Sequence, residues 1–207
     1  IAEGHGTKPW SIEPKLDQYI RGLVEDGKKM IYTVLPEDYP SKVAPALAIM
    51  TASANRDDYI LHPPSGATIN AASLPVLEKL RDAQSGRYDV QIMVSDGLNG
   101  NAITDPGHAD KFLPLLRKAL DEAGYKVAPQ TLVCKSGRVR AGYRAGEVLF
   151  GHITDKQSRR AMLHLIGERP GSEHHSFSVY LSAPVVATWA QSGKLDHDES
   201  KVVANIA

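Results

Sequence analysis

Two charged side chains stand between glycines at residues 167–171 (GERPG), directly after the apolar run at 161–166. A plain turn needs only glycine and proline, because glycine adopts unusual dihedral angles and proline fixes its own φ. Glu168 can accept hydrogen bonds from an amide-rich ligand, and Arg169 can anchor a carboxylate or a phosphate. The competing interpretation is a surface feature in which the two residues bond their own backbone. The residues alone leave both interpretations open.

Two further glycine-containing loops are candidates for ligand binding. Residues 95–101 (SDGLNGN) lack the spacing of the GxGxxG and P-loop motifs, so an ordinary strand-to-helix turn competes with a phosphate cradle. In the turn interpretation Asp96 caps a local amide. The segment Gly137-Arg138-Val139 either brings backbone close to a ligand above the sheet or forms a turn with a solvated Arg138.

Histidine and cysteine offer weaker candidates. Residues 173–175 (EHH) would need further metal ligands from Asp96 or residues 196–197, and nothing in the sequence fixes that geometry, so we expect no metal site. The single cysteine, Cys134, beside a predicted strand, is expected to be a small core residue and suits a reducing cytoplasm. Because neither a Ser/His/Asp arrangement nor an HExxH motif occurs, we expect no catalytic residues of the chain's own.

Strands alternate with helices through the second part of the chain. Buried strands are predicted at 90–94, 131–134, 162–166 and 177–182, and helices at 73–80, 105–123 and 142–152. This alternation indicates an α/β fold with a doubly wound, mainly parallel sheet. In such sheets ligands lie beyond the carboxyl ends of the strands, so the three loops are expected to converge at one edge.

The first part of the sequence is predicted to be mainly helical. The apolar spacing indicates a helix at 14–26 that Gly27 ends, and an alanine-rich helix at 41–54. Residues 55–66 are predicted to be mostly loop, and a last helix to begin at about His197. We therefore predict a helical N-terminal subdomain at 1–70 and a Rossmann-like domain at 71–207.

Composition excludes several classes of protein. The 207 residues include 24 basic and 24 acidic side chains, so a chain-wide basic field for nucleic acid is absent. The longest apolar stretch, 43–50, is far shorter than the ~20 residues that a membrane-spanning helix needs. No signal peptide is recognisable, and we expect a cytoplasmic protein without membrane partners. The absence of an initiator methionine leads us to expect a piece of a longer polypeptide.

Several segments occur together in one order: RDDYILHPPSGATI, VSDGLNGNAI, SGRVRAGYRAGEVL, LIGERPG, SFSVYLSAP and VVANI. This set, at residues 55–206, resembles the small subunit of ethanolamine ammonia-lyase, and LIGERPG and VSDGL are its most specific parts. The resemblance implies a Rossmann-like chain that packs against a TIM-barrel large subunit in a hetero-oligomer. It also implies adenosylcobalamin held between the two subunits, and a lyase that converts ethanolamine to acetaldehyde and ammonia. Residence in a bacterial microcompartment is a further association of this family.

The resemblance also implies which residues contact the cofactor. Val139 in GRV and Glu168 in GERPG would contact cobalamin, with Glu168 accepting a hydrogen bond from a corrin side-chain amide. Where the family has Cys-Ile-Ser-Asn-Ile, this chain has VVANI, so a contact at Val202 would depend on backbone or packing. Radical chemistry would occur in the large subunit, which accounts for the missing catalytic residues. No DxHxxG element occurs, so cobalamin would keep its own benzimidazole on cobalt.

Two alternatives compete with this interpretation. The first is a non-catalytic scaffold or assembly subunit that has lost cobalamin contacts. Val202 and Tyr143, which depart from the family pattern, favour it, and the intact GERPG segment argues against it. The second is an independent α/β enzyme that uses Asp96, His174 and His175 at the edge of the sheet.

Overall fold

A six-stranded mixed sheet forms the centre of the protein. The computed structural model describes residues 12–171, 175–191 and 199–206. In spatial order the strands are β1 (Ala46–Met50), β3 (Thr131–Lys135), β2 (Val90–Ser95), β4 (Ala161–Glu168), β5 (Ser176–Ser182) and β6 (Ser200–Ile206). The first four are parallel, and β5 and β6 are antiparallel to their neighbours. The predicted α/β class is confirmed.

The change from parallel to antiparallel pairing follows from the short connection between β4 and β5. Strands β4 and β5 are paired from Glu168 opposite Ser176, so only residues 169–175 join them. A parallel return would need a crossover of about a dozen residues or more, usually with a helix. The chain therefore returns as a hairpin, and the pairing changes from parallel to antiparallel at β4, the strand that leads into GERPG.

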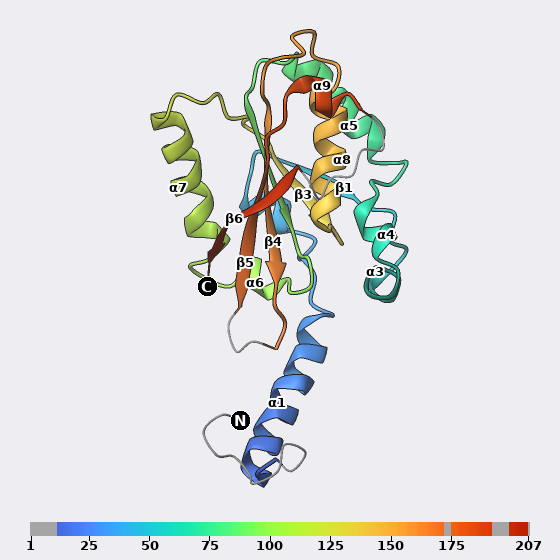
Figure 1. Cartoon of the computed structure of the whole chain (residues 1–207), viewed down its shortest axis with the longest axis vertical. Coiled ribbons are helices and arrows are strands. Elements are labelled where there is room, and N and C mark those ends of the chain that lie inside the picture. The colour runs from blue at the N-terminus through green and yellow to red at the C-terminus, as the bar shows by residue number, and fades with distance from the viewer. Residues whose placement is uncertain (1–11, 172–174, 192–198, 207) are drawn as a thin grey trace.

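Helices cover both faces of the sheet (Figure 1). The longer ones are α1 (Pro14–Met30), α5 (Leu74–Gln84), α7 (Ala109–Glu122) and α8 (Val139–Phe150), and the short ones are α2 (Tyr39–Lys42), α3 (Arg56–Leu61), α4 (Pro63–Ala67), α6 (Asn101–Thr104) and α9 (Val186–Trp189). Helix α7 covers one face, and α5 and α8 cover the other. Within the described residues no helix has the length and apolar character needed to cross a lipid bilayer.

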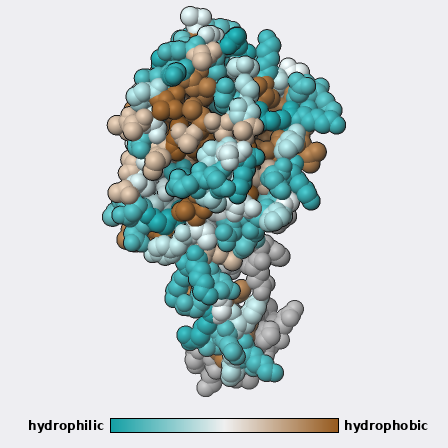
Figure 2. All heavy atoms as spheres, turned by 180° about the vertical axis from the view of Figure 1, so that it is seen from behind, coloured by the Kyte–Doolittle hydropathy of each residue, from teal (hydrophilic) through white to brown (hydrophobic). Residues whose placement is uncertain are grey.

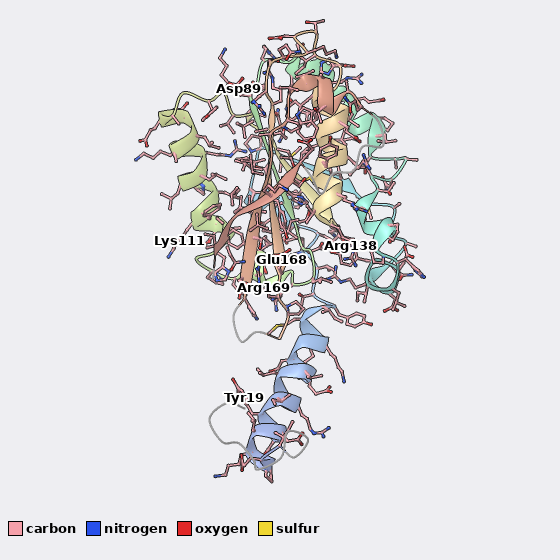
Figure 3. The ribbon with its side chains drawn as sticks, viewed as in Figure 1. Tyr19, Asp89, Lys111, Arg138, Glu168 and Arg169 are labelled. Atoms are coloured by element: carbon pink, nitrogen blue, oxygen red, sulfur yellow. The ribbon has the colours of Figure 1, made fainter. Side chains whose placement is uncertain are left out.

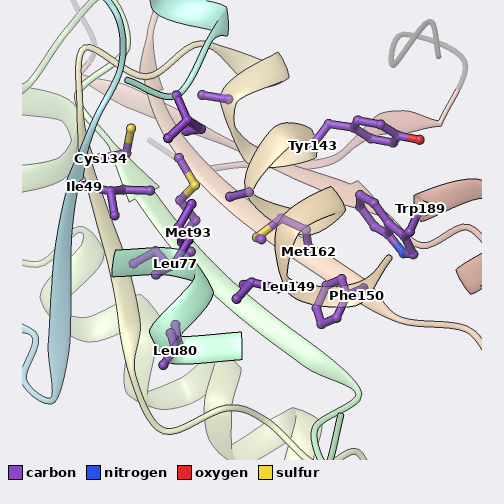
Figure 4. Close-up of a cluster of buried hydrophobic side chains, with 14 of the residues drawn as sticks. Ile49, Leu77, Leu80, Met93, Cys134, Tyr143, Leu149, Phe150, Met162 and Trp189 are labelled. Carbon is purple, nitrogen blue, oxygen red and sulfur yellow. The ribbon is translucent and has the colours of Figure 1, made fainter. Parts of the chain in front are cut away.

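Small residues let α8 pack closely on the sheet and on α9. Its glycines and alanines face inward, and a Cβ on Gly146 would lie 2.5 Å from the ring of Trp189. The rings of Tyr143 and Trp189 lie 4.7 Å apart between centroids. Figure 4 shows this cluster, in which Met162 of β4 and Leu77 of α5 complete the packing. Close packing of this kind fixes the position of α8 against the sheet and α9.

Helix α1 projects away from the sheet at the end where β4 stops (Figure 1). The helix does not end at Gly27, as the sequence had predicted, but continues to Met30. A Cβ at Gly27 would lie 3.3 Å from the Cα of Gly171, and the Gly171 N–H lies 3.4 Å from the Met30 sulfur. Gly27 therefore gives room for the GERPG loop. Seen from behind, α1 presents mainly hydrophilic side chains, whereas apolar patches lie on the body of the protein (Figure 2).

Three predicted elements differ in the structure. The helix predicted at 41–54 is wrong: β1 pairs with β3 in parallel from Ala46 opposite Thr131. The last helix from about His197 is also wrong over its described part, because β6 pairs with β5 there. In both cases hydrogen bonds to a neighbouring strand override a local helical preference. The predicted loop at 55–66 contains α3, which the Asn55 side chain caps by accepting the Asp58 N–H at 2.9 Å, and α4.

The remaining strand predictions are confirmed, and so is the inward face of α5, where Leu77 and Leu80 are buried. The predicted domain boundary at residue 70 stays a prediction, although β1 places residues 46–50 within the main sheet.

Candidate functional site

The three glycine-containing loops converge, as predicted, where β2, β3 and β4 end. Asp96 follows β2, is fully buried, and accepts the N–H groups of Ser136 at 2.8 Å and Leu35 at 3.4 Å. The Leu98 N–H donates to the Gly167 carbonyl at 2.9 Å. Asp96 therefore caps amides of neighbouring segments, which is the turn interpretation of this loop.

Burial determines the ionisation of Asp96. It raises the pKa of the carboxyl to about 6, while the charge of Arg56 and the backbone N–H groups act in the opposite direction. The Arg56 Nη1 lies 4.0 Å from the carboxylate. Because the side chain is enclosed, Asp96 holds loops together and offers no surface to a substrate.

The GRV segment begins α8. Val139 is the first residue of this helix, and it lines a pocket of about 250 Å³ with Pro63, Pro64, Ala67, Arg138 and Arg140. The interpretation of Arg138 as solvated is wrong. Its guanidinium carbon lies 4.6 Å from the centroid of the Tyr59 ring, and its Nη2 donates to the Tyr59 carbonyl at 2.7 Å. Arg138 therefore packs this segment onto α3, and Val139 stays half-buried at the rim.

Glu168 ends β4, and side chains of β5 hold its carboxylate. Oε1 accepts the Tyr180 hydroxyl at 2.7 Å, and Oε2 accepts the Ser178 hydroxyl and the Arg169 Nη1, the latter at 3.3 Å. The predicted alternative in which the pair bonds its own backbone does not describe these contacts. A carboxylate has about four acceptor positions, and these three donors leave one on Oε1. Glu168 and Arg169 lie at the same end of the sheet as Arg138 (Figure 3).

Tyr180 is a hydrogen-bond donor in this arrangement. Burial, followed by the hydrogen bond to Glu168 and its charge, raises the pKa of Tyr180 to about 12. The phenol therefore stays protonated at neutral pH and orients the Glu168 carboxylate. Tyr180 was not among the residues predicted from the sequence.

A partly polar surface extends from Glu168 across β5 and β6. Tyr180 lies opposite Val202, whose exposed fraction is 50%, and Asn205 donates to Ser178 at 3.0 Å. Side chains alternate along a strand, and Phe177, Val179 and Leu181 pack on the α7 side. The even-numbered side chains of β5 therefore face the α8 side. This alternation in FSVYLS is the sequence signal that would have revealed Ser178 and Tyr180.

The three predicted contact residues border the same side of the sheet. His164 of β4 lies directly opposite Tyr180, and the Val139 carbonyl is close enough to influence the His164 ring. Tyr180 in turn contacts Glu168 and pairs with Val202. The structure thus arranges Val139, Glu168 and Val202 around β4, β5 and β6.

Two of the three residues of the alternative enzyme site lie in the described part of the chain, and each has a structural role there. Asp96 is buried, and His175 contacts Asp105 through Nδ1. His174 and residues 196–197 lie outside the described residues. Cys134 is a buried core residue, as predicted.

Residues 28–207 match the sequence model of the family described as ethanolamine ammonia-lyase light chain (EutC). The chain belongs to this family. The resemblance first seen at residues 55–206 is confirmed, and the family match also includes the last part of α1 and the segment that leads to β1.

Curated relatives of the light-chain family are named ethanolamine ammonia-lyase small subunit. The protein of Pseudomonas syringae pv. tomato is 32% identical over 142 residues, which are 68% of this chain and 46% of the relative. That of Pseudomonas putida W619 is 30% identical over 191 residues, which are 90% of this chain and 66% of the relative. That of Pseudomonas aeruginosa LESB58 is 27% identical over 210 aligned positions, which cover 100% of this chain and 71% of the relative. The chain thus spans about half of the first of these relatives and about two thirds of the others.

Proposed function

We propose that this chain is the small subunit of an adenosylcobalamin-dependent ethanolamine ammonia-lyase, and that it holds the cofactor against a large TIM-barrel subunit. Family membership and the relatives named small subunit support a role in such a hetero-oligomeric lyase. The observation that carries the cofactor assignment is the Glu168 carboxylate, oriented by Tyr180, on the same side of the sheet as the half-exposed Val202. When bound, adenosylcobalamin would supply the radical that starts the deamination of ethanolamine to acetaldehyde and ammonia.

The donors and acceptors of this surface fit an amide-rich corrin. Glu168 is 22% exposed through its side chain and keeps an acceptor position on Oε1, which an amide N–H can fill. Val139 at the start of α8 and Val202 on β6 offer apolar contacts on the same side of the sheet. Asn205, which is exposed, can both donate and accept hydrogen bonds with amide groups.

The chain's own residues would bind and orient rather than react. Tyr180 keeps the Glu168 carboxylate aimed, and Arg169 partly balances its charge. Asp96 is enclosed and joins the loops below. The proposal also assigns the catalytic residues to the large subunit. It includes a Rossmann-like fold and residence in the cytoplasm or in a bacterial microcompartment.

Size-exclusion chromatography with visible absorbance tests the proposal. The chain is mixed with cobalamin with and without the candidate large subunit, and we expect corrin absorbance in the two-chain complex only. Loss of a hydrogen bond to a charged acceptor typically costs about 1.5–3 kcal/mol, so Glu168→Ala should weaken retention about 10- to 150-fold. Glu122→Ala is the matched control, because Glu122 is an exposed carboxylate at the end of α7.

Two outcomes would contradict the proposal in different ways. A complex that forms without corrin absorbance would leave the scaffold subunit, an alternative that the three existing donors to Glu168 and the valine at 202 favour. Failure to form any complex would contradict the large-subunit partner and would favour an independent enzyme.

A further inference from the structure

A buried polar pair lies directly beneath the first turn of α8. The Ser95 hydroxyl, at the end of β2, and the His164 Nε2, on β4, are 2.6 Å apart. Ser95 is 0% exposed and His164 is 2% exposed. Two polar side chains at this depth cost free energy unless they bond each other, so their retention calls for a structural reason.

Two glycines on either side of Val139 rest on this pair. A Cβ at Gly137 would lie 2.3 Å from the Ser95 Oγ, and a Cβ at Gly142 would lie 2.5 Å from the His164 Nδ1. Any larger residue at either position would lift the segment. The height of Val139 above the sheet is therefore set by contact with Ser95 and His164.

His164 acts as an uncharged spacer. Burial lowers the pKa of His164 to about 3, an effect that the Val139 carbonyl only partly offsets. The ring is therefore neutral at physiological pH. It can stay in the core without a counter-ion, and its hydrogen bond to Ser95 fixes its orientation.

The same strand carries the other predicted contact. His164 and Glu168 are four residues apart on β4, so their side chains lie on the same face of the sheet. His164 lies opposite Tyr180, which donates to Glu168. A single rigid strand thus supports Val139 from below and carries Glu168 at its end.

We infer that the Ser95–His164 pair is a positioning element that sets Val139 relative to Glu168, and that cobalamin affinity depends on it. The inference rests on the proposed function and goes beyond it, because both residues are buried beneath α8 and neither is exposed to a ligand. The pair acts through α8 and makes no contact with the reacting atoms.

The test compares Ser95→Ala with Gln84→Met. Gln84 donates to Gln91 at 3.0 Å in another buried polar pair, at the opposite end of β2. Each variant leaves one buried polar atom without its partner, so both should lower the melting temperature. Only Ser95→Ala should weaken cobalamin binding by the two-chain complex, by about tenfold in the dissociation constant, whereas Gln84→Met should stay within about twofold.

Hydrogen exchange provides a readout without the cofactor. In the full chain, the amides of residues 140–143 should exchange about tenfold faster in Ser95→Ala than in wild type. Their exchange rate should be unchanged in Gln84→Met. If Ser95→Ala does not fold, Gly142→Ala replaces it, since its Cβ displaces α8 without removing a polar atom, and we expect the same loss of affinity.

The outcomes separate the two proposals. Equal melting temperatures for Ser95→Ala and Gln84→Met with unchanged affinity and exchange would overturn the positioning role. If the wild-type complex takes up no cobalamin, the proposed function fails, and with it the effect on affinity. In that case hydrogen exchange of the amides of residues 140–143 tests whether the pair positions α8. Unchanged exchange in both Ser95→Ala and Gly142→Ala would overturn the positioning role as well.

Discussion

Replacing Gly167 by alanine should be strongly destabilising, because the backbone of another loop occupies the place of the new methyl group. A Cβ at Gly167 would lie 2.0 Å from the Asn99 carbonyl oxygen and 2.6 Å from that of Asp96. Backbone atoms cannot turn aside as a side chain can. The Asn99 oxygen would have to move by roughly 1 Å to reach even the shortest tolerated contact.

The loop that would have to move is held at several points. The Leu98 N–H donates to the Gly167 carbonyl, and the Asp96 carboxylate binds the N–H groups of Ser136 and Leu35. Overpacking typically costs about 1–3 kcal/mol, and the rigidity here places Gly167→Ala near the upper value. For a chain of this size, about 3 kcal/mol lowers the melting temperature by about 6–12 °C.

Thermal unfolding followed by far-ultraviolet circular dichroism measures this effect. The control is Gly22→Ala on α1, where a new Cβ would meet no atom within 4 Å and alanine favours the helix by about 1 kcal/mol. Gly22→Ala should therefore melt at or slightly above the wild-type temperature. A Gly167→Ala protein that melts within about 1 °C of wild type would refute the close approach of the two loops.

Two further changes probe the carboxylates of the site. Because the folded-state pKa of Asp96 is raised to about 6, protonation stabilises the folded state, and this contribution is present below about pH 4 and lost as the pH rises through 6. Chemical unfolding at several pH values should show wild type losing stability relative to Asp96→Asn between pH 4 and pH 6, and a constant difference would contradict the burial of the charge. Tyr180→Phe removes one donor to Glu168 and should lower the free energy of unfolding by about 1 kcal/mol in urea titrations, whereas an unchanged midpoint would show that the hydrogen bond contributes nothing.

Strands β2 and β4 could be predicted from the sequence, because short and largely apolar runs form them. Residues 90–94 and 162–166 are buried on both faces of the sheet, so their composition alone identifies them. Strand β1 could not be identified in this way, because its alanine-rich sequence suits a helix and only its pairing with β3 makes it a strand. The same reason applies to β6, which is half-exposed and depends on β5.

The candidate site was predicted only in part. Val139, Glu168 and Val202 came from the resemblance, and their role in cofactor binding stays a prediction. Their partners are distant in sequence: Tyr180 lies 12 positions from Glu168, and Ser95 lies 69 positions from His164. Contacts of this kind follow from strand order and register, which local patterns do not determine.

Helix α1 contacts Gly171 near its C-terminal end, and the rest of the helix projects away from the sheet. Its 17 residues form a helix about 25 Å long, and Gly27 and Met30 near its end contact Gly171 in the loop that follows Glu168. A molecule that binds the far end of α1 would therefore act on the loop that follows Glu168 through the contacts of Gly27 and Met30 with Gly171.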